Sequence, residues 1–340
     1  MRRIRLNLAP DLQVEFADRE RALSRIKYWA EHGMGVVQVV YGPEGCGKTA
    51  WLLQAIELLR DYGFDVIYIN PIERDFLAEV GIEDIRRRLI EILREVTGDA
   101  WARAAWAIID LVKELIRAGR RRIAVLADDV FQAIGLDRAA IYIKGGLLGL
   151  IEYPPRDYDV VITVAATSEG VSLREIGRHR WADLLAMWNM SREGFRQLYE
   201  QIPGVKPNFD EVWRLTGGNP KLLGRLYEIN WSVDDVINRL VRGKELISFI
   251  QSLNKDDREL LMKALEDPDA LMSREGIPLM NKLVELNLVI DNIYPPRDET
   301  LWIDQPPPDK DLGLGIGKYV AWQSPLHRDA VKRTLGGSIE

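Results

Sequence analysis

The chain has 340 residues, 47% of them apolar and 29% charged, and its formal net charge is −6, which is typical of two or three globular domains. Its single cysteine, Cys46, excludes an internal disulfide framework, and its three scattered histidines offer no zinc-binding spacing. No run approaches the roughly 18 to 20 apolar residues of a membrane span, and the first residues lack the apolar core of a signal peptide, so we expect a cytoplasmic protein without a membrane partner.

The first half of the chain alternates helical patterns with short β-branched apolar runs. The predicted helices lie at 16–33, 48–60, 82–97, 101–118 and within 130–152, and the predicted strands at 36–41, 64–70, 121–129 and 158–167. Asp18 is expected to cap the first helix and Gly33 to end it. Short, continuously apolar strands between helices are typical of a parallel sheet that is buried on both faces. The pattern therefore predicts an α/β fold, a doubly wound parallel sheet with helices on both faces.

The second half of the chain changes pattern, and no further buried strand of this kind is expected between about 169 and 288. Four helical patterns follow one another at 191–202, 208–218, 219–230 and 232–253. From 254 onward the order is helix, helix, strand, polar loop, strand and a last helix that Ser324 and Pro325 open, which is the order of a winged helix. We therefore expect three domains, a core at 1–185, a helical lid at 186–253 and a winged-helix domain at 254–340.

Residues 42–49 read GPEGCGKT and match the whole pattern G-x-x-x-x-G-K-[ST] between a predicted strand and a predicted helix. Such a loop (the P-loop, or Walker A motif) points its backbone N–H groups at the β- and γ-phosphates of a nucleotide, while Lys48 adds positive charge and the Thr49 hydroxyl coordinates Mg²⁺. The sequence thus predicts a site for ATP or ADP with Mg²⁺. The residues expected to hold the nucleotide here are Gly42, Pro43, Glu44, Gly45, Cys46, Gly47, Lys48, Thr49 and Ala50.

Two acids end the strand at 121–129, in the stretch IAVLADD. A P-loop needs an acid at the end of a neighbouring strand to hold the magnesium, and we assign that role to Asp128, with Thr49 as the second metal ligand. Asp129 would polarise the attacking water as general base, and Lys48 would assist at the phosphates. The alternative is that Asp129 only caps the next helix.

Polar residues that follow the strand at 158–167 are candidates to sense the γ-phosphate. The candidates are Thr167, Ser168 and Glu169. Three arginines further on have two open roles, contact with phosphate in their own or a neighbouring subunit, or surface ion pairs. These are Arg174, Arg178 and Arg180.

The ordered combination of FADRERAL, GPEGCGKT, IAVLADD, ATSEG and TGGNPKLL resembles the archaeal ATPase family of the STAND class, signal-transduction ATPases related to the AAA+ origin-recognition branch. The resemblance covers about residues 14–335. It implies an ATPase core, a helical lid and a C-terminal winged helix. It also implies that Phe16 and Arg19 lie near the adenine and that Pro220 packs on the nucleotide from the lid.

The net charge of the C-terminal region indicates which kind of partner this region can contact. Residues 244–340 contain 12 Lys and Arg against 17 Asp and Glu, which suits contact with a protein, or self-association, better than contact with duplex DNA. The favoured hypothesis is an ATP-hydrolysing conformational switch. The alternatives are a DNA-binding motor or loader and a scaffold that holds its nucleotide with little hydrolysis.

Overall fold

The computed structural model describes residues 2–73, 75–95, 101–168, 176, 180–291, 293 and 299–337. The chain divides into two compact units that each combine distant segments. Unit 1 comprises residues 1–4, 20–41 and 48–186, and unit 2 comprises residues 5–19, 42–47 and 187–340. The boundary therefore divides the P-loop, because its glycine-rich part belongs to unit 2 while Lys48 begins a helix of unit 1.

Unit 1 is built on a six-stranded sheet in the order β5-β4-β6-β7-β3-β8. The strands are β3 (Val37–Tyr41), β4 (Asp65–Asn70), β5 (Asp75–Glu79), β6 (Arg122–Asp128), β7 (Val160–Thr167) and β8 (Ala182–Ala186). All neighbours are parallel except the antiparallel pair β4–β5 at one edge. The strands β4 and β7 are buried along their whole length, as their continuous apolar sequences predict, so the mostly parallel α/β sheet is confirmed.

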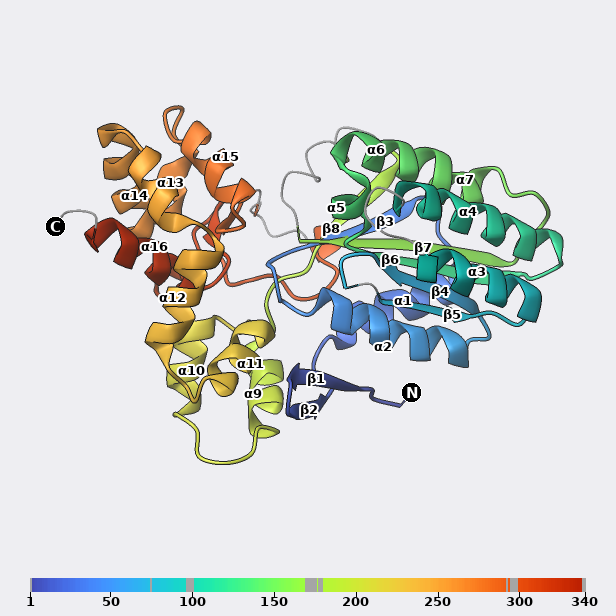
Figure 1. Cartoon of the computed structure of the whole chain (residues 1–340), viewed down its shortest axis with the longest axis horizontal. Helices are drawn as coiled ribbons and strands as arrows, with labels where there is room; N and C mark the ends of the chain where they lie inside the picture. Colours follow the sequence, from blue (N-terminus) through green and yellow to red (C-terminus); the bar gives the residue numbers. More distant parts are fainter. Residues whose placement is uncertain are drawn as a thin grey trace. The chain divides into compact units, whose positions relative to one another are not determined.

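Helices cover both faces of this sheet (Figure 1). On one face lie α1 (Glu20–His32) and α2 (Lys48–Asp61). The other face carries α3 (Glu83–Glu95), α4 (Trp101–Arg117), α5 (Val130–Ile134), α6 (Leu136–Ile141), the π-helical segment η2 (Tyr142–Leu147) and α7 (Leu148–Glu152). The apolar face predicted for the first helix is the one that α1 buries, namely Ala22, Leu23, Ile26, Trp29 and Ala30.

Three local expectations about this part of the chain are wrong. Strand β8 lies where no strand was expected, because only its last two residues are buried and its sequence has no long apolar run. The edge strand β5 was missed as well. The first helix begins at Glu20 rather than next to Asp18, whose carboxylate accepts hydrogen bonds from the backbone N–H and the hydroxyl of Ser191 at 3.0 and 3.2 Å.

Unit 2 begins with the antiparallel hairpin of β1 (Arg5–Ala9) and β2 (Leu12–Glu15). Its helices up to residue 252 are α9 (Arg192–Glu200), α10 (Phe209–Thr216), α11 (Pro220–Glu228), α12 (Val233–Gly243) and α13 (Leu246–Ser252). The last two occupy one predicted helix, which is interrupted at Glu245, where φ is 50°. Asn208 and Asn219 cap α10 and α11 with their side chains, as turn residues before apolar-periodic segments do.

The C-terminal elements of unit 2 follow the predicted order. They are α14 (Lys255–Glu266), η3 (Pro268–Met272), α15 (Ile277–Glu285), β9 (Val289–Ile290), η4 (Glu299–Leu301), η5 (Leu312–Leu314), β10 (Ala321–Trp322) and α16 (Pro325–Gly337). Strands β9 and β10 pair antiparallel, and the Ser324 hydroxyl accepts a hydrogen bond from the backbone N–H of His327, as expected of an N-cap. One apolar core joins α9–α16 with the hairpin, and the three-domain division stays a prediction.

Within the described residues, none of the helices combines the length and the apolar character that crossing a bilayer requires.

Candidate functional site

In unit 1, Lys48 and Thr49 open α2, directly after the P-loop glycines and downstream of the buried strand β3. Lys48 is only 6% exposed. The first N–H groups of a helix have no intrahelical acceptor, and the helix dipole adds partial positive charge at the same end. This end of α2 therefore favours an anion such as a phosphate.

Asp128 ends β6 and is 1% exposed. Its Oδ2 accepts hydrogen bonds from the Tyr68 hydroxyl and from Nδ2 of Asn70, both at 3.1 Å and both from β4. Its buried Oδ1 has no hydrogen-bond partner among the described residues. Two donors from the adjacent strand thus fix the orientation of the carboxylate and leave one oxygen available to a ligand.

The environment of Asp128 opposes its ionisation. Burial and the neighbouring charge of Asp129 raise the pKa of Asp128 from 3.8 to about 6, against the opposing effects of the nearby Thr49 hydroxyl, the Lys48 charge and the Tyr68 hydrogen bond. A buried carboxylate with a raised pKa and an unpartnered oxygen gains free energy from an added cation.

These residues fit a magnesium ion that is held jointly with a nucleotide. Mg²⁺ in nucleotide sites is bound by one or two protein oxygens, water and the substrate phosphates rather than by an all-protein cage. Accordingly, the described residues contain no group of three or more His, Cys, Asp and Glu side chains that would hold a metal by themselves. Oδ1 of Asp128 and the hydroxyl of Thr49 are the oxygens that would hold the ion.

Asp129 follows in a left-handed conformation, with φ 48°, and its backbone N–H donates to the Ala166 carbonyl of β7 at 2.9 Å. It stands at the N-cap position of α5 but makes no capping hydrogen bond within that described helix, which argues against the cap as its role. Ser168, just beyond β7, donates a hydrogen bond from Oγ to Oδ1 of Asp129 at 3.4 Å. The structure therefore brings together the predicted base and one predicted sensor.

The strand that carries these acids is not the immediate neighbour of the P-loop strand. Strand β7 lies between β3 and β6, with Tyr41 opposite Thr167 and Asp128 opposite Ala166. Thr167 is fully buried at the end of β7. Of the remaining candidates, Arg180 is exposed in a turn, whereas Glu169, Arg174 and Arg178 lie outside the described residues.

In unit 2, residues 42–47 of the P-loop are held by the turn that precedes α11 and by Gln323, which precedes the N-cap of α16. Asn219 donates from Nδ2 to the Glu44 carbonyl at 2.9 Å, and the Lys221 N–H donates to the Gly45 carbonyl at 3.3 Å. The Glu44 N–H donates to Oε1 of Gln323 at 2.9 Å. Asn219 and Gln323 are both buried, so these bonds are shielded from water.

The loop also packs closely against this framework. A Cβ on Gly42 would stand 1.8 Å from the Met187 carbonyl oxygen, so only glycine fits there. The equivalent position on Gly47 lies 3.9 Å from both Arg19 and Pro220. Two residues that the family resemblance associates with the nucleotide therefore border the P-loop, and Phe16, the third, is buried in the same unit.

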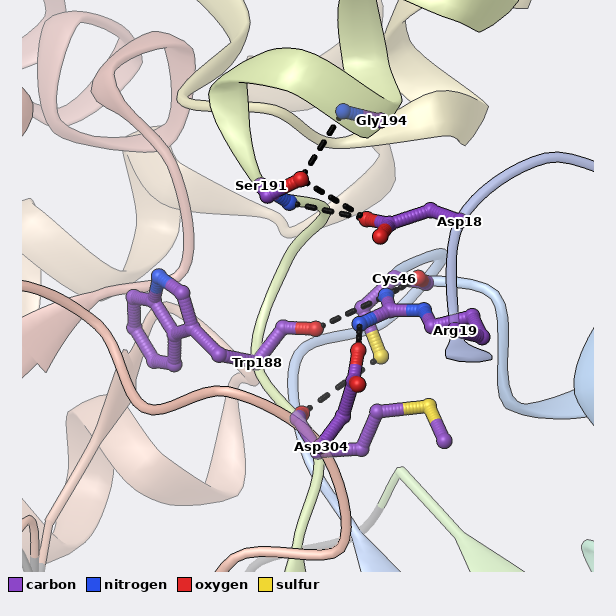
Figure 2. A network of polar contacts seen from close by, with 8 residues as sticks. Asp18, Arg19, Cys46, Trp188, Ser191, Gly194 and Asp304 are labelled. Carbon is purple, nitrogen blue, oxygen red and sulfur yellow. Dashed lines mark hydrogen bonds and ion pairs between the residues drawn. The ribbon is translucent and has the colours of Figure 1, made fainter. Parts of the chain in front are cut away.

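Arg19 is the centre of a buried polar network (Figure 2). It is 2% exposed, donates to Oδ2 of Asp304 at 2.7 Å and to the Trp188 carbonyl at 2.9 Å, and also donates to the Cys46 carbonyl. A guanidinium carries five donors in a planar fork, which lets one side chain connect three segments. Arg19 thus links the P-loop to residues 188 and 304.

The carboxylate of Glu44, on the P-loop, is the centre of a second group of ion pairs. It pairs with Lys221 at 3.0 Å and with Lys244 at 2.9 Å. Burial works against ionisation, but the charges and hydrogen bonds of Lys244 and Lys221 prevail and lower the Glu44 pKa to about 2. Glu44 is therefore ionised at neutral pH and holds α11 and the end of α12 to the loop.

Sequence reasoning missed several residues of this framework, above all Asp304, Gln323 and Asn189. Asn189 accepts from Asn219 at 3.0 Å and donates to the Gln323 carbonyl at 2.9 Å. Asp304 lies in a segment for which the sequence predicts a polar loop. The one available signal is the place of Asp304 next to the apolar residues of LWIDQ.

The fold and these residues define a P-loop ATPase. A family model described as an ATPase domain predominantly from Archaea matches residues 16–226, and the chain belongs to that family. The expectation of an archaeal-type ATPase that binds and hydrolyses ATP is confirmed at this level.

Several solved structures are similar to this chain at low sequence identity. The Walker-type ATPase PABY2304 of Pyrococcus abyssi is 15% identical, with a TM-score of 0.50 over 93% of this chain and 96% of that one. The ORC2 protein of Aeropyrum pernix, in ADPNP and ADP complexes, is 13% identical, with a TM-score of 0.44 over 98% of both chains. The ORC1 protein of Aeropyrum pernix in complex with DNA is 15% identical, with a TM-score of 0.42 over 98% and 96%. Among curated proteins, no relative matches this chain.

Proposed function

We propose that the chain is an ATP-driven conformational switch of the STAND type. ATP binds with its phosphates on residues 42–49, hydrolysis uses Asp129, and the output is a change in the C-terminal elements from α14 to α16, which act as a winged helix. The core, the lid and the winged helix would then be the three functional parts at 1–185, 186–253 and 254–340.

The observation that carries this proposal is the set of backbone contacts of Glu44. Its N–H is bonded to Gln323, next to the N-cap of α16, and its carbonyl is bonded to Asn219, the N-cap of α11. P-loop N–H groups are the groups that turn toward phosphates when a nucleotide binds. Because the N–H of Glu44 is already engaged by Gln323, a nucleotide that recruits it changes the contacts of the C-terminal segment, which is a two-state element of the kind that a switch needs.

The hydrolytic roles follow from the groups in unit 1. Asp129, oriented by Ser168, accepts the proton of the attacking water, and Lys48 balances the charge of the phosphates. Thr167 and Ser168, at the end of β7, are the residues proposed to respond to loss of the γ-phosphate. Magnesium, held by Asp128 and Thr49, would neutralise charge on the phosphate oxygens.

A protein surface, or a second copy of the chain, is the proposed partner. The acidic balance of residues 244–340 would repel the phosphates of a duplex, so DNA is the less favoured alternative.

Calorimetry tests the nucleotide site. We expect the full-length protein to bind ATP with Mg²⁺, and Lys48→Ala to weaken that binding at least about a hundredfold, because it removes the cation at the phosphates. Lys255→Ala, at a highly exposed lysine of α14, is the matched control and should bind like the wild type. Equal ATP affinity of Lys48→Ala and wild type would contradict the proposed site.

Hydrogen exchange tests the switch. Amides of β10 and α16 should differ in protection between the ATP and ADP states. Gln323→Leu should reduce this difference, because the backbone N–H of Glu44 loses its acceptor, Oε1 of Gln323. Identical protection in both states would rule out the switch. Hydrolysis that duplex DNA stimulates would favour a motor or loader.

A further inference from the structure

A cavity of about 420 Å³ lies within unit 2, next to the P-loop residue Glu44. Its walls come from α11, α12, the residue that follows α12, and α16. The charged side chains among its lining residues are four cations, Lys221, Arg225, Arg239 and Lys244, and two acids, Glu44 and Glu228. Two positive charges on the cavity walls are therefore not compensated by carboxylates.

The ion pairs show where the excess charge resides. Glu44 is shared by Lys221 and Lys244, and Glu228 pairs with Arg239 at 3.4 Å. The side chain of Arg225, which is partly buried, makes no hydrogen bond or ion pair with any described residue. An arginine in this position has its donors available for a ligand, and its planar fork suits phosphate oxygens.

His327 forms the buried wall of the cavity, with 4% exposure, and its Nδ1 lies 2.8 Å from Oγ of Ser324. Burial, together with the positive charges of Lys244, Arg225 and Lys221, lowers the pKa of His327 to about 3, although the Glu44 charge acts in the opposite direction. The imidazole is thus neutral at physiological pH. The surrounding cations create a positive potential in the cavity, and a bound anion would lower that potential.

We propose that this cavity binds a small phosphate-bearing anion of the size of pyrophosphate, with Arg225 and Lys244 as its principal contacts. Lys244 is only 18% exposed at its side chain and His327 is buried, so the site is recessed and suits a small anion better than the backbone of a duplex. Because Lys221 and Lys244 would be shared between the anion and Glu44, occupancy weakens the ion pairs of the P-loop. This regulatory consequence rests on the proposed ATP switch, whereas the binding itself does not.

Calorimetric titration of the full-length protein with pyrophosphate, without magnesium, tests the proposal. We expect Lys48→Ala, in which the P-loop cation is removed, to bind pyrophosphate within about twofold of wild type. Arg225→Gln should bind at least about tenfold more weakly, and Arg225→Lys should recover part of the loss. Arg242→Gln, at an exposed arginine of α12 that does not line the cavity, is the matched control and should be unchanged.

A second substitution is expected to strengthen pyrophosphate binding, the opposite of the effect of Arg225→Gln. In the Lys48→Ala background, Glu44→Gln should tighten pyrophosphate binding severalfold, because the anion no longer competes with a carboxylate for Lys221 and Lys244. Circular dichroism checks that each variant is folded, and Lys244→Gln replaces Arg225→Gln if the latter does not fold.

Three outcomes would overturn the proposal. They are loss of binding in Lys48→Ala with retention in Arg225→Gln, equal affinity of Arg225→Gln and Arg242→Gln, and displacement of pyrophosphate by a duplex oligonucleotide that binds with the same dependence on Arg225. Absence of ATP binding to the wild type would remove the proposed function but leave the pyrophosphate result unaffected, so the two failures are distinguishable.

Discussion

The guanidinium of Arg19 donates a hydrogen bond to the carboxylate of Asp304 at 2.7 Å, across 285 positions of the chain, and both side chains are at most 4% exposed. The same guanidinium binds the carbonyls of Cys46 and Trp188. This ion pair therefore fixes one side of the P-loop to two segments of unit 2 that the sequence keeps far apart.

Removing one partner of this pair leaves a buried charge without compensation. We expect Asp304→Asn to lower the free energy of unfolding by about 3 to 5 kcal/mol, measured by urea denaturation. Asp234→Asn breaks an exposed pair with Arg333 and, as the control, should change it by less than about 1 kcal/mol. The double variant Arg19→Met with Asp304→Leu should lose less stability than the sum of the losses in Arg19→Met alone and Asp304→Leu alone. Simple additivity of these two losses would show that the residues do not act as a pair.

Gly42 lies so close to the Met187 carbonyl that a methyl group cannot be added without moving backbone. Gly42→Ala should therefore destabilise the protein by about 1 to 3 kcal/mol and weaken ATP binding, because the loop must shift. Gly35→Ala is the matched control, since a Cβ there meets open space. Melting temperature and ATP calorimetry measure both effects, and a Gly42→Ala protein that matches Gly35→Ala in each would contradict the packing described for the loop.

His327 makes stability depend on pH. Its folded pKa of about 3 lies below the ordinary 6.5, so the unfolded chain takes up the proton first, and the stability present above pH 6.5 is lost as the pH falls. Between pH 6.5 and 4.5, the wild type should lose about 2 kcal/mol more than His327→Gln. The difference between the two proteins isolates this residue from Asp128, whose raised pKa contributes in the opposite direction.

His32→Gln, at an exposed histidine of α1, is the control for this measurement and should follow the wild type. Parallel pH curves for wild type and His327→Gln would show that His327 is not held neutral in the folded protein.

Asp129 is proposed as the general base, with Ser168 orienting its carboxylate. Substitutions at these two residues should therefore lower the rate of ATP hydrolysis and leave ATP affinity nearly unchanged. Asp129→Asn should reduce kcat for ATP hydrolysis about a hundredfold to ten-thousandfold while ATP affinity changes little, because Asn keeps the shape but cannot accept the proton. Ser168→Ala should reduce kcat by a smaller factor. Phosphate release and calorimetry measure the two quantities, and unchanged phosphate release in Asp129→Asn would favour the scaffold alternative.

Much of unit 1 could be predicted because its signals are local. The glycine pattern at 42–49 and the acids of IAVLADD adjoin continuous apolar runs, which form β3 and β6 in the structure. Strand β8 was not predictable in the same way, because it is held by its pairing with β3 and not by an apolar sequence of its own.

The sequence by itself determined the chemistry, namely a phosphate-binding loop and two acids after a buried strand. These depend on residue types at short spacing, which local backbone geometry turns into position. Only the tertiary structure decided that Arg19 pairs with Asp304, that Gln323 accepts from the P-loop, and that Glu44 is shared by Lys221 and Lys244. Such contacts join residues more than 170 positions apart, and they form because folding removes these polar groups from water and each must then find a partner.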